Sequence, residues 1–228
     1  MSRSSWRRRL ERARELEAEH PAAAEVLRFY RGIAEFQQGQ TTQDDRLPHL
    51  LALVRRAGPA ALAEAAEALA RGSTSLNADN PAHGFFVRVL EQPDFERRAQ
   101  LGNVDTGRVQ SRCPFCAEKP LAAVLRPEGE GGKRRLLCGR CFTEWDFRRL
   151  LCPNCGEEDR DKLPVYMAVE FPHVRVEACD TCKHYIKSID LTRNGLAVPE
   201  VDELAALSLD IWAAEHGYTK VQANLMGV

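Results

Sequence analysis

Four C-x-x-C pairs constrain the fold of this chain more than any other feature of its sequence. All eight cysteines lie between Cys113 and Cys182, and the first hundred residues contain none. Tetrahedral metal binding needs four thiolates that converge on one point, and a C-x-x-C turn supplies two of them. Disulfide frameworks of secreted proteins do not usually space cysteines in this way. The pattern therefore predicts two four-cysteine metal sites in a reducing compartment.

The intervals between the pairs favour two consecutive sites. They read C-x2-C-x21-C-x2-C and then C-x2-C-x23-C-x2-C, and each interval has room for a hairpin that brings its two pairs together. The expected ligands are Cys113, Cys116, Cys138 and Cys141 in the first site, and Cys152, Cys155, Cys179 and Cys182 in the second. An interleaved arrangement, which joins the second pair to the third, stays open but would leave the outer pairs far apart.

Zinc and iron both accept four thiolates in a tetrahedron. Structural zinc contributes folding free energy, roughly 10–16 kcal/mol per site in small peptides. Two short hairpin units with little apolar core need such a contribution, whereas iron would allow electron transfer. Iron–sulfur clusters usually use tighter cysteine runs. We therefore expect two metal ions per chain, each held tetrahedrally by four cysteines, with zinc favoured over iron.

Apolar residues recur at helical spacing through the first hundred residues, which predicts a helical bundle. One such stripe lies between Pro21 and Gly39, and others lie between Leu47 and Val54 and between Pro59 and Gly72. Asn80 and Pro81 supply a cap and a first-turn proline for a further helix. A separate short helix is expected over residues 94–99.

The second half of the chain changes to alternating apolar residues, which predicts strands. Val165, Met167 and Val169 are expected on one face of a strand, and the glycine-rich segment 126–133 is expected to join two others. A single helix is expected from Pro199 to Gly217. The fold class is α+β, with an N-terminal helical bundle (1–105), two tandem rubredoxin-like or zinc-ribbon units (109–150 and 151–192), and a C-terminal helix and tail (193–228).

Few other side chains suggest chemistry. His173 and His184 are expected at the surface or in the hairpins, because eight cysteines already fill two tetrahedra. Trp145 is expected to pack over the first site and Tyr185 over the second. Arg148 and Arg149 lie between the two units; an acidic partner is one possible ligand for them, and a solvated linker is the favoured expectation. No nucleophile–base pair or pair of acids has an interpretable spacing, so the sequence predicts no enzyme.

Charge and hydropathy restrict the partners. The 32 basic and 33 acidic residues nearly cancel, which argues against a protein whose main task is nucleic-acid binding. No apolar run approaches the ~20 residues of a membrane-spanning helix. The arginines of residues 7–9 are followed by a charged segment instead of the apolar stretch of an export signal. The expectation is a cytoplasmic protein without membrane insertion.

The segments "CPFC", "RLLCGRCFTEW", "LLCPNCGEEDR", "EACDTCKHYIKSID" and "DELAALSLDIWAAEHGY" occur in this order from Cys113 onward. In order and spacing they resemble the formate dehydrogenase accessory protein family FdhE. The resemblance implies a non-catalytic maturation factor that binds the catalytic subunit of a respiratory formate dehydrogenase and is needed for its assembly. It also implies that the four cysteine pairs lie in rubredoxin-like domains. Ala117 departs from the family, which often has glycine there, and the helical part is shorter than usual.

Two other functions stay open. A rubredoxin-like redox or electron-transfer protein would bind iron and absorb visible light when oxidised. A zinc-ribbon protein that binds nucleic acid would carry a basic face on its ribbons, but acidic residues offset the arginines and lysines there. The accessory role is favoured over both.

Overall fold

Helices form the first hundred residues, as the apolar periodicity predicts. The computed structural model describes residues 3–39, 43–77 and 80–227. The helices are α1 (Arg3–Glu19), α2 (Ala24–Gln38), α3 (Gln43–Ala57), α4 (Ala60–Ala70) and α5 (Pro81–Leu101), with a short 3-10 turn, η1 (Pro21–Ala23), before α2. None of the helices in these ranges is both long and apolar enough to cross a membrane.

Helix α5 differs from its prediction at its C-terminal end. It begins at Pro81 as expected but continues through Pro93 to Leu101, so the separate helix over residues 94–99 is wrong. A proline inside a helix removes one backbone hydrogen bond and costs ~3 kcal/mol. Phe95 and Ala99, beyond the proline, pack against the buried cluster that contains Trp145. This tertiary packing offsets the local cost, and a single sequence window cannot reveal it.

The strands of both cysteine segments form one mixed sheet. They are β1 (Pro120–Glu128), β2 (Gly131–Cys138), β3 (Glu144–Asp146), β4 (Val165–Met167), β5 (Val174–Cys179), β6 (His184–Asp190) and β7 (Thr219–Lys220), and a 3-10 turn, η2 (Arg160–Lys162), precedes β4. Their order is β3-β2-β1-β6-β5-β4, with β7 beside β6. Neighbouring strands are antiparallel except for β1 with β6 and β6 with β7. The parallel pairing of β1 with β6, from Ala122↔Lys187 to Leu125↔Asp190, joins the two hairpins.

One predicted strand and one predicted helix need correction. Strand β4 ends at Met167, and Val169 lies beyond it with 90% of its surface exposed. The C-terminal segment is helical but is broken at Ala206 (ψ 44°) into α6 (Pro199–Ala205) and α7 (Leu207–Glu215). The break rotates the predicted apolar stripe, so that Ile211 is exposed and Leu209 is buried.

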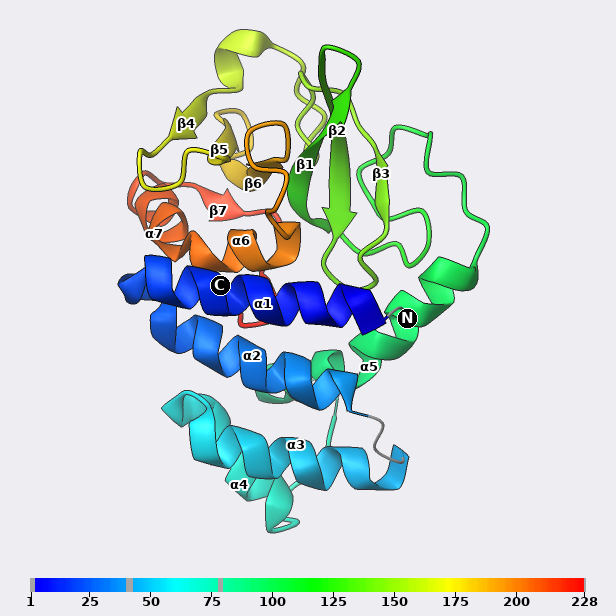
Figure 1. Cartoon of the computed structure of the whole chain (residues 1–228), viewed down its shortest axis with the longest axis vertical. Helices are drawn as coiled ribbons and strands as arrows, with labels where there is room; N and C mark the ends of the chain where they lie inside the picture. Colours follow the sequence, from blue (N-terminus) through cyan, green and yellow to red (C-terminus); the bar gives the residue numbers. More distant parts are fainter. Residues whose placement is uncertain (1–2, 40–42, 78–79, 228) are drawn as a thin grey trace.

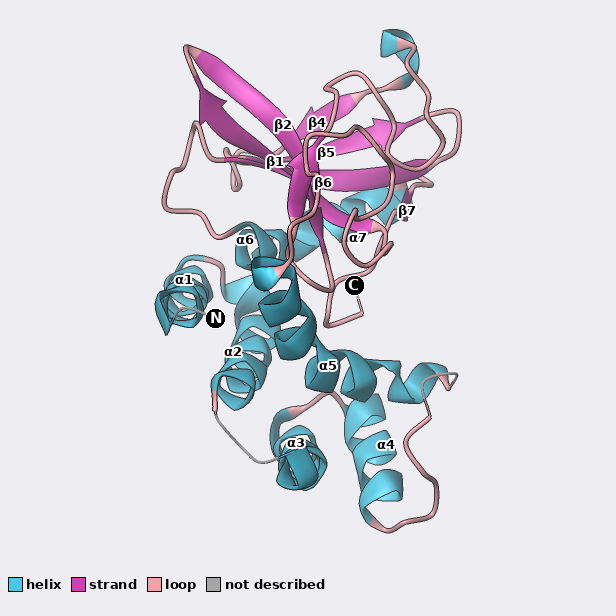
Figure 2. Ribbon diagram, turned by 90° about the vertical axis from the view of Figure 1, so that its right-hand side faces the viewer, coloured by secondary structure: helices cyan, strands magenta, loops and turns pink. Residues whose placement is uncertain are grey.

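The helices cover one face of the sheet in layers (Figures 1 and 2). Helix α6 packs on β1 and β6, and α1 and α2 pack on α6. The main core lies between these layers and includes Leu16, Leu27, Val124, Ile189 and Leu204. A second core, around Phe86 and Leu50, holds α2, α3, α4 and α5 together.

Ionised groups are buried where α6 and α7 meet the sheet. Lys187 of β6 has no exposed surface, and its ammonium nitrogen lies 3.0 Å from Glu203 Oε1 and 2.6 Å from Asp210 Oδ2. Lys220 of β7 contacts the same two carboxylates, and the Tyr185 hydroxyl donates to Asp210 over 2.7 Å. Burial lowers the pKa of Lys187, although both carboxylates oppose that shift. Burial disfavours the charged form of Glu203, but Lys187 and Lys220 outweigh it and lower its pKa to about 2.

A second buried network ties α1 to α6. Arg12 Nη2 donates to Asp202 Oδ1 over 2.7 Å, and His173 Nε2 lies 2.7 Å from the same oxygen. Asp202 also accepts from the amide of Val198, the N-cap residue of its own helix, over 2.7 Å, which satisfies one of the N–H groups at that end of α6. His173 lies in the loop between β4 and β5, so its predicted place in a hairpin is right, but at 8% exposed it is buried and not at the surface. Its partner lies 29 residues further along the chain, beyond the range of local patterns.

Lys187→Met should destabilise the protein strongly. Removing one partner of a buried ion pair leaves uncompensated buried charge, which costs about 3–5 kcal/mol. Urea unfolding measures the loss. Lys133→Met is the matched control, because Lys133 is also a strand lysine paired with a carboxylate, at 2.7 Å from Asp146, but it lies at the surface. Equal effects of the two substitutions would contradict a structural role for the buried network.

The stability that Glu203 contributes should depend on pH. Its folded pKa of about 2 lies below its ordinary 4.5, so the contribution is complete above about pH 4.5 and is lost as the pH falls toward 2. The difference in unfolding free energy between the wild type and Glu203→Gln should therefore be constant from pH 7 to 5 and narrow below that. Metal loss in acid destabilises both proteins alike, so the difference between their unfolding free energies reports the contribution of Glu203 alone. A pH-independent difference would refute the assignment.

Candidate metal centres

The first cysteine cluster lies where β1 begins and β2 ends. Its closest sulfur–sulfur distances are 3.5 Å for Cys113–Cys141, 3.4 Å for Cys116–Cys138 and 3.6 Å for Cys116–Cys141. Four sulfurs at 2.3 Å from a central zinc ion would lie about 3.8 Å apart, so the cluster is close to the size of a tetrahedral site. The Phe115 amide points at Cys113 Sγ over 3.4 Å, which favours a thiolate there.

The second cluster repeats this arrangement where β5 ends and β6 begins. Cys152 and Cys182 have sulfurs 3.7 Å apart, as do Cys155 and Cys179. The cysteines are thus grouped in sequence order, in the two sets of four that the spacing favours, and not interleaved. Each set could hold one metal ion, since its four sulfurs lie within 4.8 Å of one another.

All four C-x-x-C turns share one backbone conformation. The residue after each second cysteine has a positive φ: Ala117 (60°), Phe142 (54°), Gly156 (81°) and Lys183 (57°). Glycine adopts this left-handed conformation freely, and other residues resist it. Gly156 therefore suits its position. Ala117 adopts the same turn despite its Cβ, so the departure from glycine does not change the backbone geometry.

Both clusters lie at the same end of the sheet. The first precedes β1 and the second precedes β6, and these neighbouring strands run parallel. Lys119 Nζ lies 3.4 Å from Asn154 Oδ1, which links the first knuckle of one unit to that of the other. The parallel pairing therefore brings the two clusters close together at one end of the sheet.

The two clusters differ in their surroundings. Trp145 has no exposed surface and packs in a buried cluster with Cys113, Cys138 and Cys141, as predicted. Tyr185 has no such role in the second cluster, because its ring lies in the main core and its hydroxyl donates to Asp210. Tyr185 therefore does not cover the second cluster as Trp145 covers the first, and its predicted position is wrong.

The second cluster is the more exposed one. Cys155 is exposed and Cys182 is half-buried, whereas in the first cluster only Cys116 is not buried. Burial opposes ionisation of Cys182, but hydrogen bonds from Asn154 and from the His184 amide outweigh it and lower its pKa to about 7. Ionisation near neutral pH suits the expected role of Cys182 as a metal ligand, since the thiolate is the form that binds metal.

The remaining predicted residues lie outside the two clusters. Arg148 is exposed and pairs with Glu158, and Arg149 donates to the Gly132 carbonyl, which agrees with a solvated linker. His184 is no ligand of the second cluster in this arrangement, and its Nδ1 lies 2.7 Å from the Cys182 carbonyl oxygen.

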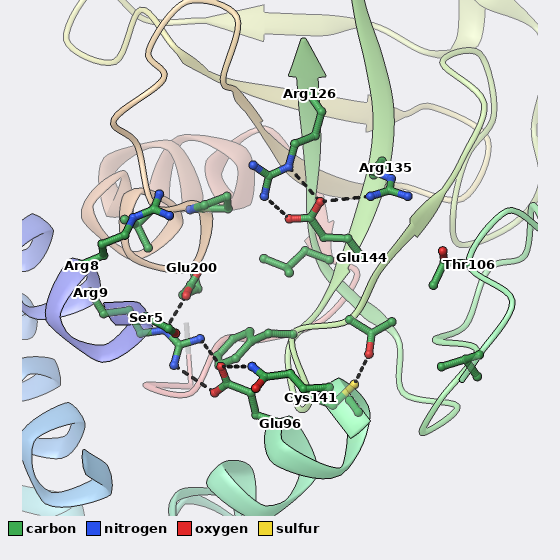
Figure 3. Close-up of a pocket in the computed structure, with 18 of the residues that line it drawn as sticks. Ser5, Arg8, Arg9, Glu96, Thr106, Arg126, Arg135, Cys141, Glu144 and Glu200 are labelled. Atoms are coloured by element: carbon green, nitrogen blue, oxygen red, sulfur yellow. Dashed lines mark hydrogen bonds and ion pairs between the residues drawn. The ribbon is translucent and has the colours of Figure 1, made fainter. Parts of the chain in front are cut away.

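A cavity of about 550 Å³ adjoins the first cluster through Cys141 (Figure 3). Its charged side chains are largely paired with one another. Arg9 binds Glu96 through two hydrogen bonds of 2.8 and 2.9 Å and Glu200 through one of 2.6 Å. Arg126 donates to Glu144 over 3.0 Å. These pairs tie α1 to α5 and α6, and β1 to β3, so the cavity wall has a structural role.

Metal loaded into the two clusters should leave at two rates. We expect two zinc equivalents per chain and faster release from the second cluster, where Cys155 is open to a chelator. Release to a chromogenic chelator measures both phases. Cys155→Ser should abolish the fast phase, and Cys116→Ser, at the corresponding position of the first cluster, should abolish the slow one. The reverse assignment, or one common rate for both sites, would contradict the difference in exposure.

Comparisons with known proteins agree with this geometry. The family model "FdhE, central domain" matches residues 112–149 and "FdhE, C-terminal domain" matches residues 151–226. "Protein FdhE homolog" of Aquifex aeolicus is 40% identical over 116 residues, which are 50% of this chain and 41% of that protein. The homolog of Pseudomonas aeruginosa is 35% identical over 123 residues, 50% of this chain and 38% of that protein. The matched part thus spans well under two thirds of these curated relatives.

The whole chain also resembles a solved structure. The crystal structure of the FdhE protein from Pseudomonas aeruginosa superposes with a TM-score of 0.75, at 24% identity, over 100% of this chain and 97% of that one. At this identity the likeness shows the fold, and it extends the match to the helical half. Taken with the two domain models, which together match half of the chain and include both cysteine clusters, it shows that the chain belongs to the FdhE family.

Proposed function

We propose that the protein is a non-catalytic accessory factor that binds the catalytic subunit of a respiratory formate dehydrogenase in the cytoplasm before assembly. The observation that carries the proposal is the match of both FdhE domain models to the two segments that form the cysteine clusters. The part of the chain that matches the family is therefore the part that contains both cysteine clusters.

The chemistry of the clusters supports a structural role. Catalytic zinc sites keep one coordination position open for water or substrate, whereas four thiolates close the coordination sphere. Each cluster offers four sulfurs to one ion, so the ions would serve as staples for the hairpin ends. We propose two tetrathiolate-bound ions per chain with these eight cysteines as ligands, and zinc in preference to iron.

An electron carrier is the second candidate, and the exposure of Cys155 is the observation that favours it. A redox site must lie near the surface to exchange electrons with a partner. Iron in a tetrathiolate site gives the oxidised protein a visible absorption band, and zinc gives none. Metal analysis and an absorption spectrum of protein purified from its host therefore distinguish the two candidates.

Affinity capture tests the accessory role. The tagged protein, expressed in its own host during anaerobic growth with formate, should capture a formate dehydrogenase catalytic subunit that mass spectrometry identifies. Cys152→Ser should lose the second metal ion and the captured subunit together, because the hairpin end loses its staple. Host cells that make the dehydrogenase but yield none of it in the captured fraction would refute the proposal. So would full capture by a Cys152→Ser protein that lacks the second ion.

A further inference from the structure

The face of the sheet opposite the helices has a second cavity, of about 390 Å³, beside the second cluster. Its charged lining is strongly basic. The lining includes four arginines and a single carboxylate, namely Arg134, Arg149, Arg160, Arg175 and Glu177. Glu177 lies 2.7 Å from Arg134 and 3.5 Å from Arg175, so two arginines share it. Within the described ranges, Arg149 and Arg160 have no carboxylate within ion-pair distance. These side chains give the cavity an excess of three positive charges, and the adjoining second cluster, with a divalent ion on four thiolates, would offset two of them and leave the excess positive.

One of these arginines is only loosely paired. Arg175 Nε is buried and makes no hydrogen bond within the described part of the chain, although Glu177 Oε1 lies 3.5 Å from it, at ion-pair distance. Since Arg134 binds the same carboxylate more closely, Glu177 satisfies Arg175 only in part. An acidic group from a bound partner would meet the exposed part of the Arg175 side chain, which is 25% exposed, and neutralise the excess charge.

Apolar side chains lie beside these arginines. Leu150 and Val165 line the cavity and are 52% and 53% exposed. Met167 is 53% exposed and lies opposite Arg175 in the register of β4 and β5. Since the three residues are large and apolar, a ligand that contacted only the arginines would leave them in water. The surface suits a ligand with both acidic and apolar groups.

The backbone of β4 indicates how such a ligand would bind. Strand β4 is at the outer edge of the sheet (Figure 1). The Ala178 amide donates to the Pro164 carbonyl over 3.0 Å, and antiparallel pairs alternate between bonded and non-bonded positions. Val165 and Met167 therefore direct their N–H and C=O groups away from β5, toward the free edge. An extended peptide can add there as a further strand.

We propose that the cavity and the free edge of β4 bind an extended, acidic polypeptide segment with alternating apolar residues. Its backbone would pair with Val165 and Met167, and its carboxylates would meet Arg160 and Arg175. An unassembled enzyme subunit would be the source of such a segment. The identity of the partner therefore rests on the proposed function, and the β4 site adds to it where the partner binds. A nucleic acid would satisfy the arginines but not the apolar groups or the strand edge.

A synthetic peptide tests the site without the enzyme subunit. The probe is a fluorescein-labelled decapeptide of alternating glutamate and valine, titrated with the zinc-loaded protein and followed by fluorescence anisotropy. A lysine–valine decapeptide should not bind. Arg160→Ala should weaken binding about fivefold, because a charge-assisted contact is lost. Arg148→Ala is the matched control, since this exposed arginine lies outside the cavity lining, and should bind the probe like the wild type.

Met167→Pro tests strand addition directly. The substitution removes an N–H that faces away from β5, so the existing sheet keeps its hydrogen bonds. Binding of the probe should weaken about tenfold, the equivalent of one lost hydrogen bond, with the thermal unfolding temperature unchanged. Probe affinity equal to that of the wild type, equal binding of the lysine peptide, or displacement of the probe by a short oligonucleotide but not by unlabelled peptide would overturn the proposal.

The same variant separates this inference from the proposed function. Capture of a formate dehydrogenase subunit by the wild type, but not by Met167→Pro, supports both. Equal capture by the two proteins leaves the accessory role in place and overturns the β4 site. Binding of the probe without capture of any dehydrogenase subunit supports the site and counts against the proposed function.

Discussion

The parallel pairing of β1 with β6 is the constraint on which the rest of the structure depends. Parallel strands need a long crossover between them, and here it contains β2, β3, β4 and β5. The pairing places both cysteine clusters at one end of the sheet and puts Lys187 beside Ala122 at its centre. It also creates the continuous face on which α6 lies. Without it, the two hairpins would be separate units, each with little core of its own.

The helix-covered face is held by charge as well as by apolar packing. Lys187, Glu203 and Asp202 are at most 1% exposed, and each has an oppositely charged partner. Burying an ion pair contributes little net free energy, but separating its two buried charges is costly. An arrangement in which α6 sits elsewhere on the sheet would separate them and is therefore disfavoured. Each pair also joins separate elements: Lys187 joins β6 to α6, and Arg12 joins α1 to α6. The networks thus fix the position of α6 between the sheet and the helical half.

The sequence was informative where the chemistry is local. The C-x-x-C pairs, their grouping and the position of Trp145 follow from residues close together in the chain, and the structure agrees with them. The buried networks could not be predicted from the sequence. Lys187 has the polar neighbours Ser188 and Asp190 in its strand, so in the sequence it looks like a lysine at the surface. Its partner Glu203 lies 16 residues further on. Long-range packing likewise decides the course of α5 through Pro93.

The difference between the clusters links metal retention to partner binding. Cys152 and Cys179 line the basic cavity, whereas the first cluster is enclosed by Trp145 and its neighbours. A segment bound in the cavity would cover part of the second cluster and favour its metal-loaded form. Thermodynamic linkage is reciprocal, so metal in the second cluster must then strengthen binding of the segment by the same factor. The more exposed cluster would thereby make recognition depend on the metal, while the enclosed one keeps the sheet intact.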